Sequence, residues 1–185
     1  MLKSMALKST IFKATLHIAD MDRNVYGDFP LTVARHPSET DERMMLRLAV
    51  FALFADERLQ FTKGLSTQDE PDLWTKSLSD EIELWIDLGL PEESRIRKAC
   101  GRADQVVIVA YGDRATPVWW QKNQKDLVRF DNLRIYSIDQ ETLASMAVMA
   151  ARTMDLQCTI QDGQLWLSDA TNNLSFELKT LFPEG

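Results

Sequence analysis

One carboxylate stands out because it lies in the middle of an apolar stretch. Residues 81–90, EIELWIDLGL, alternate strictly, which predicts a strand with isoleucine and leucine on one face and with Trp85 and Asp87 on the other. Burying an ionised carboxylate is costly unless a metal ion, a cation or backbone donors compensate it. Asp87 is therefore the first candidate for a functional site. The alternative is a structural ion pair with one of three arginines: Arg35, Arg43 or Arg95.

A cluster of basic side chains follows this strand in a predicted helix over residues 91–103. An apolar stripe that begins at Ile96 defines the packed face of the helix. In a helical-wheel projection Lys98 points away from the apolar stripe. Arg95 and Arg97 flank the stripe and can reach round its edge. These cations could stabilise negative charge near Asp87, and Arg95 ranks at least level with Lys98 for that role. The alternative is a solvated helix face.

Other chemical groups give less specific signals. His36 stands at the entrance of a predicted helix, and His17 is expected on the exposed face of a strand. WWQKNQK (119–125) combines tryptophans with lysines, which suits stacking on unpaired bases, although at least one tryptophan is expected in the core. Cys100 and Cys158 lack zinc-finger spacing and are expected to be buried thiols. No phosphate-binding glycine loop, nucleophile elbow or nicotinamide fingerprint occurs.

The size and charge of the chain limit the classes of function. The chain has 185 residues, of which 45% are hydrophobic, as is typical of one globular domain, which we place at 1–185. Its net charge of −7 argues against a protein that coats nucleic acid by bulk attraction, but not against a local basic groove. No apolar run approaches the roughly 20 residues of a membrane span, and no secretory signal is apparent. We therefore expect a cytoplasmic protein that does not associate with membranes, and the sequence leaves its oligomeric state open.

The first half of the chain predicts a hairpin followed by a helix. Residues 9–20 alternate as a half-buried strand, and 29–36 return as its partner after a turn-forming stretch. Residues 36–58 predict a helix that is capped by Ser38 or Thr40 and is apolar nearly all round, so it should be deeply buried. A polar stretch then includes a short strand near Phe61 and a helical turn that begins at Pro71.

The second half predicts an α/β arrangement. The strand at 81–89, the helix at 91–103 and the continuous β-branched strand at 105–112 form a βαβ unit. A further strand at 132–138 precedes a helix that is capped by Asp139, and the tail predicts a β-meander whose first turn is Asp162-Gly163. We therefore predict a mixed α/β domain with a central sheet, flanking helices and antiparallel strands at its ends.

Five stretches carry a resemblance to a known family: ARHPSETDERMMLRL, DEPDLW, LWIDLGLPEESRIRKA, WWQKN and TIQDGQLWLSD. Together they resemble the YaeQ family of bacterial proteins, essentially end to end. That family in turn resembles the PD-(D/E)XK superfamily of nucleases. The resemblance implies a restriction-endonuclease-like core of helix, strands, helix and strand, with an added N-terminal hairpin and C-terminal β-meander.

The resemblance also implies roles for individual residues. Nucleases of this superfamily hold Mg²⁺ on acids from adjacent strands, and the metal activates the attacking water. The second acid maps onto Asp87, and the first onto Asp72 in the Pro-Asp pair. Glu42 is the implied third acid from the preceding helix. Gly89 stands where the motif has a lysine, so Arg95 or Lys98 would have to replace that cation.

Each assignment has an alternative in the sequence itself. Glu70 or Glu83 could stand in place of Asp72, which could instead be a first-turn acid of a helix. Glu42 leans over the covered face of its helix but could serve only the helix dipole. Glu39 is expected to pair with Arg43, four residues later.

Two functions remain compatible with the sequence. The first is a Mg²⁺-dependent endonuclease or exonuclease acting on nucleic-acid phosphodiesters, with Asp72, Asp87 and Glu42 as metal ligands. The alternative is a catalytically inactive module that binds nucleic acid or a protein partner and is connected with transcription. The retained acids favour the first function, whereas Gly89 and the negative net charge favour the second.

Overall fold

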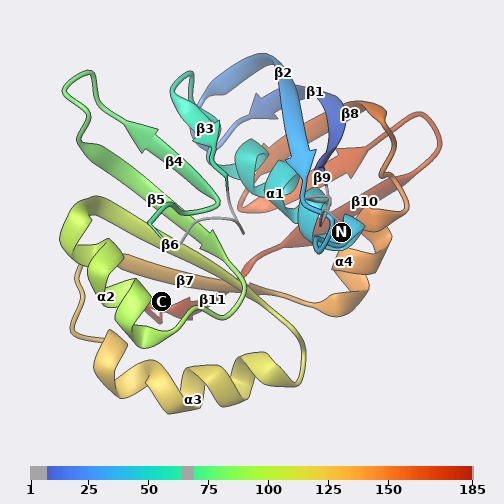
Figure 1. The fold of residues 1–185 in the computed structure, drawn as a ribbon. Coiled ribbons are helices and arrows are strands. Elements are labelled where there is room, and N and C mark those ends of the chain that lie inside the picture. Colours follow the sequence, from blue (N-terminus) through green and yellow to red (C-terminus); the bar gives the residue numbers. More distant parts are fainter. Residues whose placement is uncertain (1–7, 64–68, 185) are drawn as a thin grey trace, which may run out of the picture.

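A computed structural model describes residues 8–63 and 69–184 of the chain. Within these residues the strands form two separate sheets, with two helices between the sheets and two helices on the far face of the second sheet (Figure 1). The mixed α/β class is thus confirmed. The sequence predicted one central sheet with added strands, whereas in the structure the added strands form a sheet of their own.

The first sheet joins the N-terminal hairpin to the C-terminal meander. Its order is β10-β9-β8-β1-β2, with β1 and β2 paired antiparallel along their whole length and β8 running parallel to β1. The two-residue turn Asp162-Gly163 joins β8 to β9, and both residues have positive φ, as a tight hairpin turn requires. The strands are β1 (Thr10–Asp20), β2 (Val25–Arg35), β8 (Thr153–Gln161), β9 (Gln164–Ser168) and β10 (Asn173–Glu177).

The second sheet has the order β11-β7-β6-β5-β4-β3. Its centre is parallel, because α2 and α3 connect β5 to β6 and β6 to β7, while β3, β4 and β11 are antiparallel to their neighbours. The strands are β3 (Leu59–Phe61), β4 (Leu73–Lys76), β5 (Ile82–Leu88), β6 (Ala103–Tyr111), β7 (Leu133–Ile138) and β11 (Lys179–Phe182). The predicted helical turn after Pro71 is wrong: this segment is β4, whose alternating residues pair with β5.

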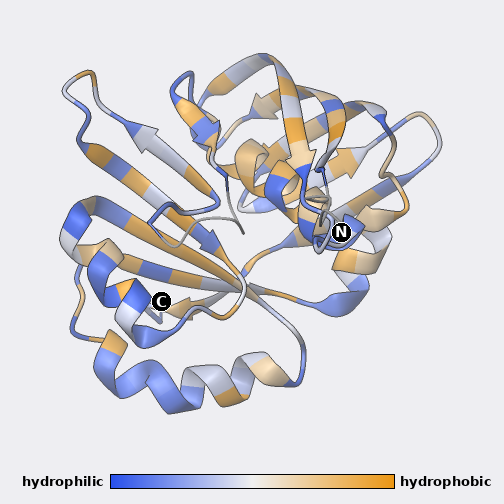
Figure 2. Ribbon diagram, in the orientation of Figure 1, coloured by the Kyte–Doolittle hydropathy of each residue, from blue (hydrophilic) through white to orange (hydrophobic). Residues whose placement is uncertain are grey.

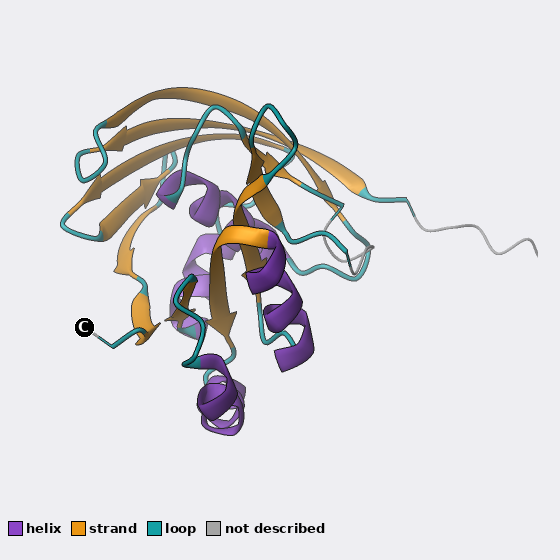
Figure 3. Ribbon diagram, turned by 90° about the vertical axis from the view of Figure 1, so that its left-hand side faces the viewer, coloured by secondary structure: helices purple, strands orange, loops and turns teal. Residues whose placement is uncertain are grey.

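The second sheet separates two hydrophobic clusters, one on each face. Helices cover both faces (Figures 2 and 3). Helices α1 (Asp41–Leu53) and α4 (Gln140–Ala147) pack between the two sheets, which explains why α1 is buried from Met44 to Ala52. Helices α2 (Glu93–Arg102) and α3 (Ala115–Leu127) cover the other face. Thr40 caps α1 and Asp139 caps α4, as the sequence predicts.

Helix α3 has no clear signal in the sequence and was not predicted. Its residues are largely polar and only Thr116, Trp119 and Leu127 are buried, so its apolar stripe is too sparse to stand out. The predicted helices at 36–58 and 140–154 are also longer than α1 and α4. None of the described helices is long and apolar enough to cross a membrane.

Candidate functional site

Asp72 and Asp87 lie opposite each other on neighbouring strands. Leu73 of β4 pairs with Ile86 of β5 in antiparallel register, so the preceding residue, Asp72, stands across from Asp87. Both residues are buried, with exposed fractions of 5% and 3%. The alternative acids lie elsewhere: Glu83 pairs with Arg58 at the surface, and Glu70 supplies a backbone carbonyl to Arg95. The two acids are thus neighbours along the backbone, but their carboxylates pair with helices on opposite faces of the second sheet.

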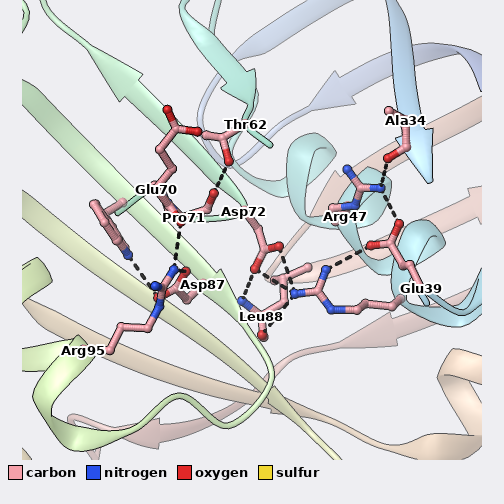
Figure 4. Close-up of polar contacts among 12 residues, drawn as sticks. Ala34, Glu39, Arg47, Thr62, Glu70, Pro71, Asp72, Asp87, Leu88 and Arg95 are labelled. Carbon is pink, nitrogen blue, oxygen red and sulfur yellow. Dashed lines mark hydrogen bonds and ion pairs between the residues drawn. The ribbon is translucent and has the colours of Figure 1, made fainter. Parts of the chain in front are cut away.

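Arg95 of α2 holds Asp87 in a bidentate pair. Its Nε donates to Asp87 Oδ2 at 2.8 Å and its Nη2 donates to Oδ1 at 3.0 Å (Figure 4). The indole Nε1 of Trp85, on the same face of β5, donates to Oδ2 at 3.1 Å. Because two parallel N–H bonds to a carboxylate are the strongest geometry for such a pair, Asp87 is compensated by the protein itself. Of the three arginines considered from the sequence, Arg95 makes this contact.

Arg43 of α1 holds Asp72 from the other side of the sheet. Its Nη2 donates to both carboxylate oxygens of Asp72, at 2.9 and 3.0 Å. The backbone N–H of Leu88 adds a third hydrogen bond, at 2.8 Å (Figure 4). The pair with Glu39 that was expected from the sequence is confirmed, because Arg43 Nη1 donates to Glu39 Oε2 at 3.0 Å. One guanidinium therefore bridges two buried carboxylates.

Arg47 extends this network along α1. Its Nη2 donates to Glu39 Oε1 at 2.5 Å and to the carbonyl oxygen of Ala34 at 3.0 Å (Figure 4). Arg47 was not among the residues singled out from the sequence. The spacing of Glu39, Arg43 and Arg47 at intervals of four was the available signal, since residues four apart share one face of a helix.

Burial and ion pairing have opposite effects on the pKa values of these side chains. Burial raises the pKa of Asp72, and the nearby charge of Asp87 adds to this, while Arg43 and the Leu88 N–H act in the opposite direction. Burial would lower the pKa of Arg43, but the charges of Asp72 and Tyr111 and the hydrogen bonds to Asp72 and Glu39 together outweigh it, and the pKa is raised. The hydrogen bond to Asp87 likewise raises the pKa of Arg95. Both arginines are therefore charged and neutralise the acids.

This arrangement does not fit a Mg²⁺ site. Mg²⁺ needs carboxylate oxygens that are free to coordinate it in octahedral geometry, whereas every oxygen of Asp72 and Asp87 already accepts a hydrogen bond from a guanidinium. Glu42, the implied third ligand, instead accepts from Gln140 Nε2 of α4 at 3.0 Å. Among residues 8–63 and 69–184, no three acidic, histidine or cysteine side chains are arranged to hold a metal. Metal binding by these acids remains a prediction, and their partners argue against it.

Gly89 has a backbone conformation that explains the missing lysine. Its φ is +104°, in a region that residues with a side chain rarely adopt, and its N–H donates to the carbonyl oxygen of Val109 at 2.9 Å. This conformation turns the chain from the end of β5 towards α2. A lysine at this position would be strained, whatever space its side chain found.

The basic cluster of α2 borders a cavity of about 970 Å³ next to the Asp87–Arg95 pair. Trp85 forms part of its wall, and the guanidinium groups of Arg95 and Arg102 lie 5.7 and 5.2 Å from the centre of one indole ring of Trp85. Arg102 also donates to the carbonyl oxygen of Asp69 at 2.9 Å. Lys98 lies at the rim, exposed, with no ion pair to any described residue. We call this feature the α2 cavity.

The remaining candidates have structural partners. His36 interacts with Ser38, and His17 lies on the outer face of the first sheet between Asp28 and Asp155, whose hydrogen bonds raise its pKa. Trp119 is core, as expected for one tryptophan of the pair, and its Nε1 donates to the carbonyl oxygen of Pro91 at 2.8 Å.

The last residues considered from the sequence are the two cysteines and two arginines, Arg35 and Arg97. Cys158 is buried as predicted, whereas Cys100 is only partly buried, since it lies at the edge of the packed stripe of α2. Burial raises the pKa of these thiols, to about 12 for Cys158 and about 11 for Cys100, so neither is a reactive thiolate at neutral pH. Arg35 pairs with Asp41 and Arg97 with Glu93, away from Asp87.

Comparisons with known proteins agree with this fold. The family model described as YaeQ protein matches residues 5–178. Proteins named "Uncharacterized protein YaeQ" from Escherichia coli (strain K12) and Salmonella typhi are each 55% identical over 174 residues, covering 94% of this chain and 96% of theirs.

Two solved structures are similar in fold. The crystal structure of YaeQ protein from Xanthomonas axonopodis pv. citri has a TM-score of 0.91 and 43% identity, covering 94% of this chain and 98% of that one. The crystal structure of YaeQ protein from Pseudomonas syringae has a TM-score of 0.90 and 35% identity, covering 95% and 97%. The chain belongs to the YaeQ family.

Proposed function

We propose that this protein is a nuclease-like module of the PD-(D/E)XK type that binds nucleic-acid phosphates without hydrolysing them. The observation that carries the proposal is the pairing of both motif acids with arginines: Asp72 with Arg43 and Asp87 with Arg95. In such a site, guanidinium groups occupy the carboxylate oxygens that a catalytic metal would need.

The order of elements supports descent from a nuclease. Helix α1, the antiparallel strands β3-β4-β5, helix α2 and the parallel strand β6 follow one another as in a restriction-endonuclease-like core. Asp72, just before β4, and Asp87, in β5, match the positions that the resemblance assigns to the two acids, which supports the proposal. Fold alone does not confer activity, so the proposal depends on the side chains of the site.

The chemistry of the site argues against hydrolysis. Phosphodiester cleavage in this superfamily depends on a metal-activated water and a nearby lysine. Here both acids are neutralised by arginines, and Gly89 is fixed in a conformation that excludes the lysine. The site can still present positive charge to a phosphate, because guanidinium and ammonium groups donate strongly to phosphate oxygens.

The α2 cavity is the surface that we assign to the ligand. Lys98 and Arg102 border it without a carboxylate partner among the described residues, and Arg95 closes its inner end. Two acids, Asp69 and Glu92, share the wall, so binding should be local and weak compared with that of a basic protein.

Hydrolysis is tested directly with labelled single- and double-stranded DNA and RNA in the presence of Mg²⁺ or Mn²⁺. We expect no cleavage above that of a buffer control, by the wild-type protein or by the Asp87→Asn variant. Cleavage that is lost in Asp87→Asn would overturn the proposal in favour of a metal-dependent nuclease. Cleavage that is equal in both proteins would not come from this site, and the binding assay then decides.

Binding is tested by fluorescence anisotropy with labelled single strands at several salt concentrations. Removing Lys98 and Arg102 together should lower the slope of log affinity against log salt by about 1.4, since each phosphate contact contributes about 0.7 for a single strand. The matched control is Lys122→Ala with Lys125→Ala on α3. Asp87→Asn should bind more tightly, because it removes a negative charge next to the cavity. An equal loss in both double variants, or no binding at all, would contradict the assignment.

A further inference from the structure

A second cavity lies at the other end of the sheet from the basic cluster of α2. It has a volume of about 520 Å³, within the range of small-molecule sites. Its walls come from three segments: the start of α3, the end of β7 with the start of α4, and the chain that leads from β10 into β11. We call it the switch cavity.

The fold itself creates this cavity. β6 and β7 are adjacent parallel strands, but the helices that follow them lie on opposite faces of the sheet. α3 packs through Trp119 on the face that carries Ile108, and α4 packs through Leu143 on the face that carries Val107. Where successive connections leave a sheet to opposite sides, a crevice opens at the carboxyl ends of the strands, and ligands of open α/β sheets bind there.

Acidic side chains dominate the wall of the switch cavity. Asp113, Asp139 and Glu177 line the cavity together with one lysine, Lys179, among the described residues. The carboxylate of Glu177 lies beside Gly163, at the turn between β8 and β9, so Asp113 and Asp139 supply the negative charge of the site. Asp113 Oδ1 accepts from the N–H of Gln140 at 2.9 Å, and Asp139 Oδ1 accepts from the N–H of Thr142 at 2.8 Å. These bonds fix the two carboxylates at the start of α4 and leave each with free lone pairs.

Two further side chains indicate that the switch cavity can hold a ligand. Thr116 lines the cavity with an exposed fraction of only 7%, and its hydroxyl has no hydrogen-bond partner among the residues that the structure describes. Buried hydroxyls are ordinarily bonded, so this oxygen calls for a partner that is absent from the chain around it. Trp120 adds an aromatic wall, held in place by Trp119 and Phe182.

The way the acids are anchored indicates the charge of the ligand. Asp113 and Asp139 both lie at the start of α4, where each carboxylate is held by a different backbone N–H, that of Gln140 and that of Thr142. A ligand that pairs with both carboxylates must carry a positive charge for each. Its apolar part would pack against Trp120, whose indole also attracts cations.

We propose that the switch cavity binds an extended organic cation, an aliphatic chain with two or more ammonium groups. Asp113 and Asp139 bind the ammonium groups, Trp120 contacts the methylene chain, and Thr116 accepts or donates the remaining hydrogen bond. Lys179 opposes the binding of a cation. This proposal concerns a different surface from the α2 cavity and does not depend on the phosphate-binding role.

Isothermal titration calorimetry with spermidine at low salt tests the proposal. We expect saturable binding at one site, and no binding of an uncharged diol of similar chain length. The double variant Asp113→Asn with Asp139→Asn keeps the hydrogen bonds to α4, because an amide oxygen also accepts, but it removes both charges. Its affinity should fall by at least about tenfold, because it loses two charge-assisted hydrogen bonds.

Two controls separate a site from general attraction to an acidic chain. Asp104→Asn with Asp131→Asn removes two exposed charges elsewhere and should leave affinity within about twofold of wild type. Lys179→Ala should tighten binding by roughly two- to fivefold, because it removes a repulsive charge. Absence of saturable binding, equal losses in the two double variants, or weaker binding by Lys179→Ala would each overturn the proposal.

Discussion

The two aspartate–arginine pairs use the same chemistry in different surroundings. In the Asp72–Arg43 pair, the side chains are 6% and 10% exposed, and the guanidinium also binds Glu39 inside the layer between the sheets. In the Asp87–Arg95 pair, the carboxylate is 4% exposed but the arginine is 28% exposed, at the edge of the α2 cavity. One pair is sealed in the protein, and the other has its cation at the surface.

This difference separates a structural role from a binding role. The sealed pair joins α1 to β4 and β5 through a chain of buried charges, so it fixes the helix against the sheet. The half-open pair holds Arg95 at the wall of the α2 cavity, where the guanidinium also donates to the carbonyl oxygen of Glu70 and lies over Trp85. We therefore expect Arg43 to contribute mainly to stability, and the proposed ligand to contact the side of the sheet that carries Arg95.

Truncating Arg43 should give the largest effect on stability. Arg43→Ala leaves Asp72 without its cation and removes one of two guanidinium partners of Glu39, in a layer that water does not reach. Removing one member of a buried pair typically costs about 3–5 kcal/mol of the free energy of unfolding. Urea denaturation followed by circular dichroism measures this loss.

The surface pair Arg58–Glu83 is the matched control for Arg43. Its side chains are 45% and 36% exposed, and Arg58→Ala should leave the free energy of unfolding close to that of wild type, because exposed ion pairs contribute little. A loss for Arg43→Ala as small as that for Arg58→Ala would show that water or a shifted side chain compensates Asp72, and the sealed pair would lose its structural role.

Truncating either member of the half-open Asp87–Arg95 pair should lower the free energy of unfolding by less than Arg43→Ala does. The loss should differ between the two members. Asp87→Ala should cost about 1.5–3 kcal/mol, since it removes charge-assisted hydrogen bonds but leaves Arg95 able to reach water. Arg95→Ala should cost more than Asp87→Ala, because it leaves the more deeply buried charge without a cation. Urea denaturation of both variants shows which one loses more free energy of unfolding. Equal losses would mean that the two side chains are equally accessible to water.

The smallest effect on stability is expected for Asp139, a solvent-exposed carboxylate. The hydrogen bond from Thr142 lowers the pKa of Asp139, so the folded protein favours the ionised form. Its stabilising contribution is therefore present above the unfolded pKa of about 3.9 and is lost as the pH falls through the lower folded value. Asp139→Asn should cost about 0.5 kcal/mol at pH 7 and less near pH 3. A difference from wild type that is equal at both pH values would contradict this.

The sequence predicted the local structure around Asp87 well because that structure is governed by short-range patterns. The alternation of β5, the stripe of α2 and the position of Arg95 beside Asp87 all follow from spacing within about fifteen residues. The N-caps Thr40 and Asp139 and the turn at Asp162-Gly163 were recognisable for the same reason.

Contacts between distant segments could not be predicted. Arg43 reaches Asp72 across 29 positions of sequence, and the parallel pairing of β1 with β8 decides that the added strands form a second sheet. The segment after Pro71 resembles a helix start, but pairing with β5 makes it a strand. The switch cavity requires α3, whose sparse apolar pattern gave no signal, and the path of α4 to the opposite face.

The turn at Gly89 also limits how this lineage can evolve. Because its φ of +104° suits only glycine, a mutation to lysine would strain the backbone by about 1–3 kcal/mol before any new ammonium could act. A lysine at this position would require the loop before α2 to be rebuilt at the same time. The backbone conformation of one residue thus restricts which single substitutions this loop can accept.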